Sequence, residues 1–310
     1  MLRVVLRRVA IGVPVVIGVS AIIFFVLRVL PGNPVQAITQ NAPTTPGERH
    51  DIIVEFGLDK PLFSQYLSYL GNAIHGNFGL SFQTREPVTT EIGAQAMATV
   101  ELAIAAMLMT VVAGVGLGVV SALLRDTWVD SVIRVLSLLG SSMPIIWSAP
   151  LLILVFSFTL RLFPANGSGS LAQLVLPAAS IALVTSGVII RLVRTSMLEV
   201  MSQEFVTALR AKGVPEARIW IRHILRNALV PAVTLLGVQL GGLLSGAVIA
   251  ESAFGRQGLG SLLVNGIENK DFPMVQAIVL IVATAYVVIN ILVDISYAYL
   301  DPRVRTQLAR

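Results

Sequence analysis

The residue types that perform most protein chemistry are few and scattered in this sequence of 310 residues. There is no cysteine, so thiolate metal sites, disulfides and cysteine nucleophiles are excluded. The three histidines, His50, His75 and His223, lie far apart, and neither the His-Glu-x-x-His nor the Gly-x-Ser-x-Gly pattern occurs. Each of the three lysines is followed by Pro, Gly or Asp, so there is no Gly-x-x-x-x-Gly-Lys-Ser/Thr loop for nucleotide phosphates. We therefore expect this chain to have no enzyme activity, no metal site and no bound cofactor.

Recognition of another molecule is the chemistry that the polar stretch 191–226 does favour. Ser202 can cap a helix, and Gly213 followed by Pro215 is a common helix stop. A second helix is expected to begin near Glu216. The pattern predicts a helix, a tight turn and another helix that project from the rest of the chain.

The second of these helices would carry one basic stripe, because Arg218, Arg222 and Arg226 recur at four-residue spacing. Such a hairpin can rest on anionic lipid. Alternatively, a short helix of this kind can dock into a groove of a cytoplasmic partner and transmit its motion. The spacing alone leaves both interpretations open.

The elements that position this stretch are predicted to be membrane helices. The composition is 55% apolar and 13% charged, and the mean hydropathy is +0.83. A helix needs about 20 apolar residues to cross the hydrocarbon core. Six runs free of Asp, Glu, Lys and Arg qualify: 9–27, 102–124, 135–160, 171–190, 227–250 and 272–293. The first run is too long for a cleaved signal peptide, so we expect an all-α integral membrane protein with six helices.

The distribution of basic residues predicts the orientation. Most arginines flank the runs on one side, which includes residues 191–226 and both termini, and the positive-inside rule places that side in the cytoplasm. The formal charge of +5 therefore suits membrane topology. We expect the lipid bilayer as a partner, and no nucleic acid.

The long connection after the first helix is expected to fold as a small extracytoplasmic helical cap. Residues 45–48, Thr-Pro-Gly-Glu, have capping-box spacing, and Gly57 would end the helix that they begin. A second amphipathic helix would place five apolar side chains on one face before Gly76: Phe63, Tyr66, Leu67, Leu70 and Ile74. We divide the chain into residues 1–31, the cap 32–98, and a five-helix core 99–310 that contains the cytoplasmic stretch 191–226.

Residues 203–213 read Gln-Glu-Phe-Val-Thr-Ala-Leu-Arg-Ala-Lys-Gly. This segment resembles the EAA loop of ABC importer permeases, with Thr207, Ala208 and Leu209 at the Glu-Ala-Ala positions and Gly213 at the glycine. Because Thr207 and Leu209 depart from the motif, shape and backbone are expected to matter more than one charge. Other segments are similar to the B-type permease subunit of the dipeptide, oligopeptide, nickel and glutathione class, in the same order along nearly the whole chain: 30–34, 56–61, 75–81, 251–255, 258–260, 269–273 and 300–303.

This resemblance implies a type I ABC importer permease fold in the plasma (inner) membrane of a prokaryote. It implies four partners: a second homologous permease, two cytoplasmic ATPase subunits that bind ATP and Mg, and an extracytoplasmic substrate-binding protein. The implied function is the translocation of di- or oligopeptides delivered by that binding protein. Nickel complexes, glutathione or another small solute are alternatives for the same machinery.

The resemblance also implies two sets of site residues. The loop that couples to the ATPases would contain Glu204, Phe205, Thr207, Ala208, Leu209, Arg210, Lys212 and Gly213. In it, Arg210 and Lys212 would face the acidic rim of the partner, or would alternatively be solvated or lipid-facing charges. A gate or a contact for the binding protein would contain Glu251, Phe254, Gly258 and Gly260, although the two glycines can equally serve a turn.

An ion-driven secondary transporter is a less favoured alternative. Such a protein normally keeps a carboxylate within a span, whereas here only Glu101 and Asp294 lie near span ends, where local pairing or an interfacial position explains them. Within the spans, Pro144 and Pro150 are expected to kink the third helix.

Overall fold

The computed structural model describes residues 2–29, 38–39, 45–55 and 59–300. Over these residues the fold is helical, and pairing of extended backbone is limited to one isolated bridge between Leu80 and Pro87. Five of the described helices are long and apolar enough to cross a membrane, and a sharply bent pair makes a sixth if it counts as one span. The predicted all-α fold with six spans is thereby confirmed.

By its internal contacts the chain forms two compact units. A terminal unit contains Met1–Thr99 and Gln257–Arg310, and a central unit contains Val100–Arg256. The two ends of the chain share one unit because the first and last helices pack together. The division 1–31, 32–98 and 99–310 follows expected membrane crossings, a different criterion, and stays a prediction.

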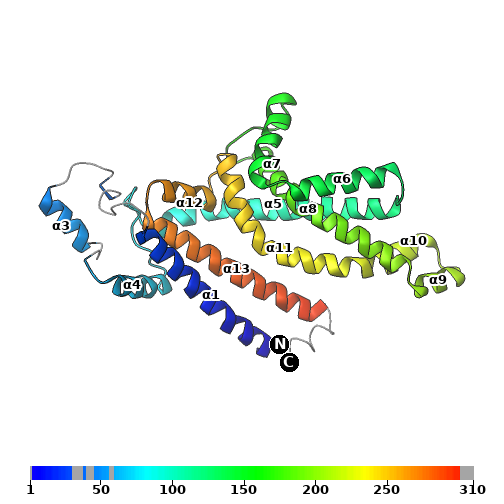
Figure 1. Cartoon of the computed structure of the whole chain (residues 1–310), viewed down its shortest axis with the longest axis horizontal. Coiled ribbons are helices and arrows are strands. Elements are labelled where there is room, and N and C mark those ends of the chain that lie inside the picture. Colours follow the sequence, from blue (N-terminus) through cyan, green and yellow to red (C-terminus); the bar gives the residue numbers. More distant parts are fainter. Residues whose placement is uncertain (1, 30–37, 40–44, 56–58, 301–310) are drawn as a thin grey trace. The chain divides into compact units, whose positions relative to one another are not determined.

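The terminal unit is built on two long antiparallel helices, α1 (Leu2–Val29) and α13 (Phe272–Leu300), which lie side by side in Figure 1. Helix α12 (Leu259–Glu268) packs on α13. Two segments singled out from the sequence meet here, because Ser81 Oγ donates a hydrogen bond to the carboxylate of Asp271. Both side chains are buried, so this bond fixes the start of α13.

Helix α3 (Pro46–Glu55) has the capping box that the sequence predicts. The Thr45 amide donates to Glu48 Oε2 at 2.8 Å, and the Glu48 amide donates to Thr45 Oγ1 at 3.3 Å. The bond from the Thr45 backbone lowers the pKa of Glu48. The expected helix stop at Gly57 lies outside the described residues.

Helix α4 (Leu62–Ile74) is the second helix predicted before Gly76, and Gly76 follows it with φ +75°. The expected packing face is only partly right. Tyr66 is buried, but Phe63, Leu67 and Ile74 are 66%, 53% and 82% exposed. The helix contacts its unit through a neighbouring stripe and leaves most of its predicted apolar face uncovered.

The central unit is organised around α8 (Leu171–Met201), which packs against α11 (Arg226–Ala253), α6 (Trp128–Ser142) and α7 (Ile145–Leu152). Within its apolar window α8 is 56% buried, whereas the other single spans are 17–39% buried. The long helix α5 (Val88–Leu123) begins in the terminal unit and continues into this one. Helix α8 therefore forms the centre of the central unit.

The third predicted span, 135–160, is not one rod. Helix α6 ends at Ser142, and α7 with its π-helical continuation η1 (Ile153–Thr159) leaves at an angle of 115°. Pro144 stands at the N-cap of α7, where it lacks the backbone donor that would continue α6. The kink predicted at Pro144 is confirmed, and it is sharp enough to break the helix, whereas Pro150 lies inside α7.

Glycines allow close approach to α8. A side chain at Gly114 or Gly118 of α5 would meet Ile189 or Val193 at under 3.0 Å. Where α6 crosses α8, a Cβ at Gly187 would overlap the carbonyl oxygen of Ser137, and a Cβ at Gly140 would lie 2.8 Å from that of Leu183. Helix backbones here are in direct contact, which is typical of small residues in membrane helices.

Gly187→Ala is predicted to destabilise the protein by about 1–3 kcal/mol, because the added methyl group meets backbone that cannot rotate away. The measurement is the thermal midpoint of the purified, detergent-solubilised protein, followed by tryptophan fluorescence. Gly116→Ala is the matched control, since a Cβ there has open space around it. Equal midpoints for the two variants would show that α6 and α8 are not in close contact.

Candidate functional site

The polar stretch forms a short helical projection at the end of α8. Helix α9 (Glu204–Ala211) is followed by a turn, the single-turn α10 (Glu216–Arg218) and the π-helix η2 (Ile219–Leu225), which continues into α11 (Figure 1). The predicted helix, turn and helix are confirmed. The expected cap at Ser202 is wrong, because α8 runs on to Met201 and the Ser202 hydroxyl donates back to the Glu199 carbonyl.

The turn after α9 is a Schellman motif. Gly213 has φ +74°, its amide donates to the Arg210 carbonyl at 2.9 Å, and the Val214 amide donates to the Leu209 carbonyl at 3.2 Å. Val214 and Leu209 both pack against the same apolar core, which is the contact that accompanies this motif. Gly213 thus supplies the turn, as predicted from the sequence.

Helix α9 has two different faces. Val206 is fully buried against η2, where Ile219 and Ile224 are also fully buried, and Leu209 is half-buried beside them. The opposite face is exposed and contains Glu204, Phe205, Thr207, Ala208 and Lys212. Of the residues expected at the coupling loop, Leu209 therefore holds the helix in place, whereas the five exposed residues just named are available to a partner.

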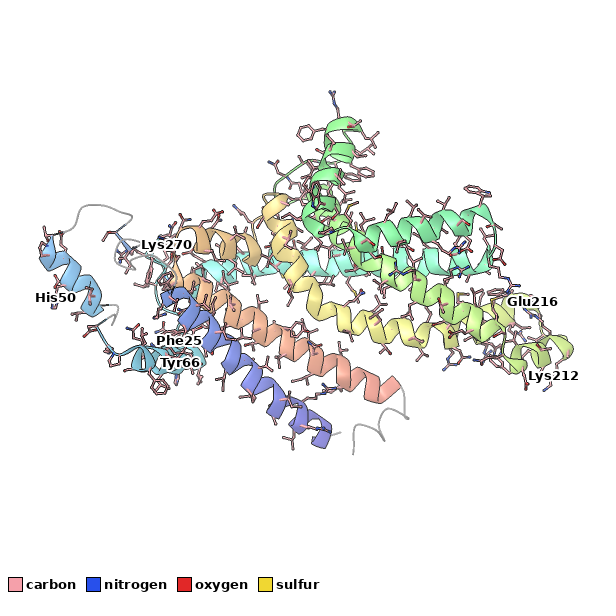
Figure 2. The ribbon with its side chains drawn as sticks, in the orientation of Figure 1. Phe25, His50, Tyr66, Lys212, Glu216 and Lys270 are labelled. Carbon is pink, nitrogen blue, oxygen red and sulfur yellow. The ribbon has the colours of Figure 1, made fainter. Side chains whose placement is uncertain are left out.

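Arg210 is tied to its own projection. Its Nε lies 2.7 Å and its Nη2 3.4 Å from the two carboxylate oxygens of Glu216, across the turn. This carboxylate raises the pKa of Arg210. In Figure 2, Lys212 and Glu216 are labelled at the same tip. Because both side chains of the pair are about half exposed, the bond adds little stability, but it braces the turn.

The basic stripe is present on the other arm of the projection. Arg218, Arg222 and Arg226 are all exposed along η2 and its ends, while Ile219 and Ile224 face the core. The structure confirms the stripe as a surface feature. It does not decide between lipid and protein as its partner.

The structure contains a buried ion pair near this projection that the sequence did not predict. Asp130, at the start of α6, is fully buried and receives Arg194 of α8 in a two-pronged pair, with N–O distances of 2.8 and 2.7 Å. Ser121 Oγ from the end of α5 donates to the same carboxylate at 2.5 Å, as does the Asp126 amide at 3.2 Å. One carboxylate thus joins α5, α6 and α8, two turns before α8 ends at the projection.

The sequence did contain a sign of this pair. Thr127 and Asp130 have capping-box spacing, and the Asp130 amide donates to Thr127 Oγ1. An acidic residue beside an apolar run also needs a partner, but the partner lies 64 positions away in Arg194. Spacing along the chain therefore could not identify it.

The four residues expected at a gate or binding-protein contact are divided between the two units, and all four are buried. In the central unit, Glu251 and Phe254 are 0% and 1% exposed, and Phe254 packs with Ala149 and Leu176. In the terminal unit, Gly258 and Gly260 are buried at the start of α12. Because no side chain of this set reaches the surface, the buried arrangement suits a gate better than a direct contact. The left-handed turn residue here is Gly255, with φ +55°, whereas Gly258 is extended.

Of the two explanations left open for Glu101, an interfacial position or a charge partner, the structure shows a charge partner. The guanidinium of the buried Arg256 donates to Glu101 Oε2 at 3.1 Å, at the end of the central unit that also holds Phe254. A charge pair of this kind explains Glu101 without a proton relay.

The central unit also has an apolar groove of about 910 Å³ between α5, α6, η1 and α8. Its walls are mainly aliphatic and aromatic, including Leu108, Leu136, Phe156 and Leu183. A groove with so few polar atoms does not suit a solute with charged ends.

Asp130→Asn is predicted to lower the free energy of unfolding by about 2–3 kcal/mol. This is less than the full cost of breaking a buried pair, because the Arg194 side chain is 18% exposed and can still be solvated when its partner is lost. The measurement is again the thermal midpoint in detergent. Asp126→Asn is the control, because that side chain is 87% exposed, and its effect should stay within about 0.5 kcal/mol. If both variants behave like the parent, the Asp130 carboxylate does not hold the three helices together.

Comparison with known proteins gives a consistent result along the whole chain. The family model described as "Binding-protein-dependent transport system inner membrane component" matches residues 114–306, and the corresponding N-terminal model matches residues 1–103.

Individual relatives match over nearly their full length. A di/tripeptide transport system permease protein, DppB, of Pseudomonas aeruginosa is 37% identical over 99% of this chain and 100% of its own. The dipeptide permease DppB and the glutathione permease GsiC of Escherichia coli K12 are 34% and 35% identical, each over 98% of this chain and 99% of its own.

A solved structure shares the fold. A chain of the MetNI methionine ABC transporter, in an inward-facing conformation, superposes with a TM-score of 0.57 at 17% identity. The match covers 70% of this chain and 99% of that one. The expected type I permease fold is confirmed by this likeness.

Proposed function

Because the chain belongs to the family of binding-protein-dependent transport system inner membrane components, we propose that it is the permease subunit of an ABC importer that translocates di- or oligopeptides. Two of the relatives described above are peptide permeases and match from end to end. Glutathione is the second candidate solute, because the glutathione permease matches equally well over the same length. Family membership also makes the chain a transport subunit, as the sequence predicted, and not an enzyme.

The observation that carries the mechanism is the exposed face of α9 at the end of the most buried helix. Phe205 and Ala208 present an apolar, shallow surface on a helix whose other face is anchored by Val206. A short helix of this kind suits a groove on a partner. We assign the docking of a cytoplasmic ATPase subunit to this face.

Coupling then follows from rigidity. A displacement of α9 is passed to α8 and α11, because α9 packs on η2, η2 continues into α11, and α8 leads directly into α9. ATP and Mg would bind on the two ATPase subunits, and their closure would bias the permease between inward- and outward-facing states. A second homologous permease and an extracytoplasmic binding protein complete the proposed complex.

This mechanism requires α9 to lie in the cytoplasm. The basic residues of the projection, Arg218, Arg222 and Arg226, support that side by the positive-inside rule. Both termini are proposed to lie on the same side, in the plasma membrane of a prokaryote.

Ala208→Glu is predicted to reduce co-purification of the ATPase subunits and binding-protein-stimulated ATP hydrolysis at least about tenfold, because a desolvated charge on the docking face costs more than 1.4 kcal/mol. The measurement is ATPase activity of the complete complex in liposomes, with and without the binding protein. Ala172→Glu is the matched control: it makes the same exchange at an exposed site in the first turn of α8, where a carboxylate is tolerated. Normal stimulation in Ala208→Glu would exclude α9 as the docking element.

The orientation has its own test, which the absence of cysteine makes simple. Ser202, beside α9, and Ser168, before α8, are both exposed and can each be replaced by a single cysteine. In intact cells a membrane-impermeant maleimide is expected to label Ser168→Cys only, and Ser202→Cys is expected to react only after permeabilisation. The opposite pattern would reverse the proposed topology and remove α9 from reach of cytoplasmic ATPases.

A further inference from the structure

Helix α4 combines an exposed apolar surface with a complete lack of charge. Its 13 residues, Leu-Phe-Ser-Gln-Tyr-Leu-Ser-Tyr-Leu-Gly-Asn-Ala-Ile, contain no Asp, Glu, Lys or Arg. Phe63, Leu67 and Ile74 share one helical stripe and are 66%, 53% and 82% exposed. The helix is too short to cross a bilayer, which needs about 20 residues. An exposed apolar stripe of this kind on a helix without charges indicates contact with another apolar surface.

The first attachment of α4 is to α1, deep along that helix. The hydroxyl of Tyr66 lies 2.9 Å from Ser20 Oγ and donates to the Ile17 carbonyl at 3.2 Å. The Tyr66 ring also packs on Phe24 and Phe25, with centroid distances of 5.2 and 5.8 Å. Figure 2 shows Phe25 and Tyr66 close together. The whole contact lies beside the membrane-crossing part of α1.

Two further bonds fix the orientation of α4. Arg28 donates from Nε and Nη2 to Gln65 Oε1 at 3.2 and 3.1 Å, and it stacks 3.5 Å above the Phe24 ring. On the other side, the Tyr69 hydroxyl donates to the Gln276 carbonyl of α13 at 3.2 Å. With three attachments to two long helices, the exposed stripe of α4 has a fixed direction.

The depth of these attachments can be estimated from the helix rise. Ser20 precedes Arg28 by eight residues, or about 12 Å at 1.5 Å per residue, and Gln276 follows Phe272 by four residues, or about 6 Å. Helices that lie in the membrane interface bury their apolar face about 5–10 Å below the headgroups. The attachment to α13 lies within that depth, and the attachment to α1 lies slightly below it.

We propose that α4 is an interfacial membrane helix whose Phe63, Leu67 and Ile74 side chains insert into the leaflet at the C-terminal end of α1. The Phe25 ring of α1, which packs on Tyr66, is itself 38% exposed and adds apolar surface beside the stripe. The polar side of α4, with Ser68 and Asn72, faces water. With the orientation proposed above, this leaflet is the outer one; the insertion itself does not depend on that assignment or on ATPase coupling.

The test uses neighbouring positions on α4. Leu67→Cys and Ser68→Cys are labelled with the environment-sensitive fluorophore NBD in the complete complex, reconstituted in liposomes. The label at residue 67 is expected to emit at shorter wavelength and to be quenched at least about threefold more by lipids with a nitroxide near the headgroup end of the acyl chain than by aqueous iodide. The label at residue 68 should show the reverse preference. Phe63→Cys repeats the measurement in case the exchange at Leu67 disturbs the docking of α4.

Two results would overturn the proposal, and a third would support it but reverse the topology. Iodide quenching at residues 63 and 67 equal to that at residue 68 would show that the stripe faces water. Protection from iodide that appears only when the binding protein is added, without quenching by nitroxide lipid, would assign the stripe to that protein. Quenching by nitroxide lipid in the inner leaflet alone would support insertion and would reverse the topology, so a failure of the transport proposal can be told apart from a failure of this one.

Discussion

Direct backbone contact around α8 is the constraint on which the central unit depends. Gly140, Gly187 and Gly118 remove the side chains that would otherwise separate α6 and α5 from it. In a bilayer, water does not drive helices together, so such close packing and internal hydrogen bonds must do so. The resulting helix is rigid up to Met201, and a rigid α8 is what gives the exposed face of α9 a defined position.

Polar groups act at the ends of this packing. Near α9, the Asp130 carboxylate accepts hydrogen bonds from Arg194 and Ser121. At the other end of the part of α5 that belongs to the central unit, Arg256 pairs with Glu101. Between these ends, the described surfaces that face α8 are mainly apolar. The helices are thus held by packing along their length and by charge pairs at their ends, where the cost of placing a charge in hydrocarbon is lowest.

The sequence predicts much of this architecture because the underlying signals are local. Runs of apolar residues identify the spans, Thr45 and Glu48 identify the start of α3, and Gly213 identifies the turn after α9. It fails where the cause lies elsewhere in the chain. The packed face of α4 depends on Ser20 and Gln276, and Ser202 ends α8 instead of capping α9. The partners of α4 are distant in the sequence, and hydrophobic periodicity does not identify those residues.

The π-helical geometry of η2 has a consequence for how the projection is built. A π turn is closed by a hydrogen bond between residues i and i+5, so it contains one residue more than an α turn, which is closed between residues i and i+4. Deleting one residue from Ile219–Leu225 would let the backbone relax to a regular α-helix, and the helices on either side would keep nearly the same rotation, because the wide turn already absorbs the extra residue. Deleting one residue from the regular helix α11 would instead rotate everything before the deletion by about 100°. The direction in which α9 points is therefore more sensitive to the length of α11 than to the length of η2.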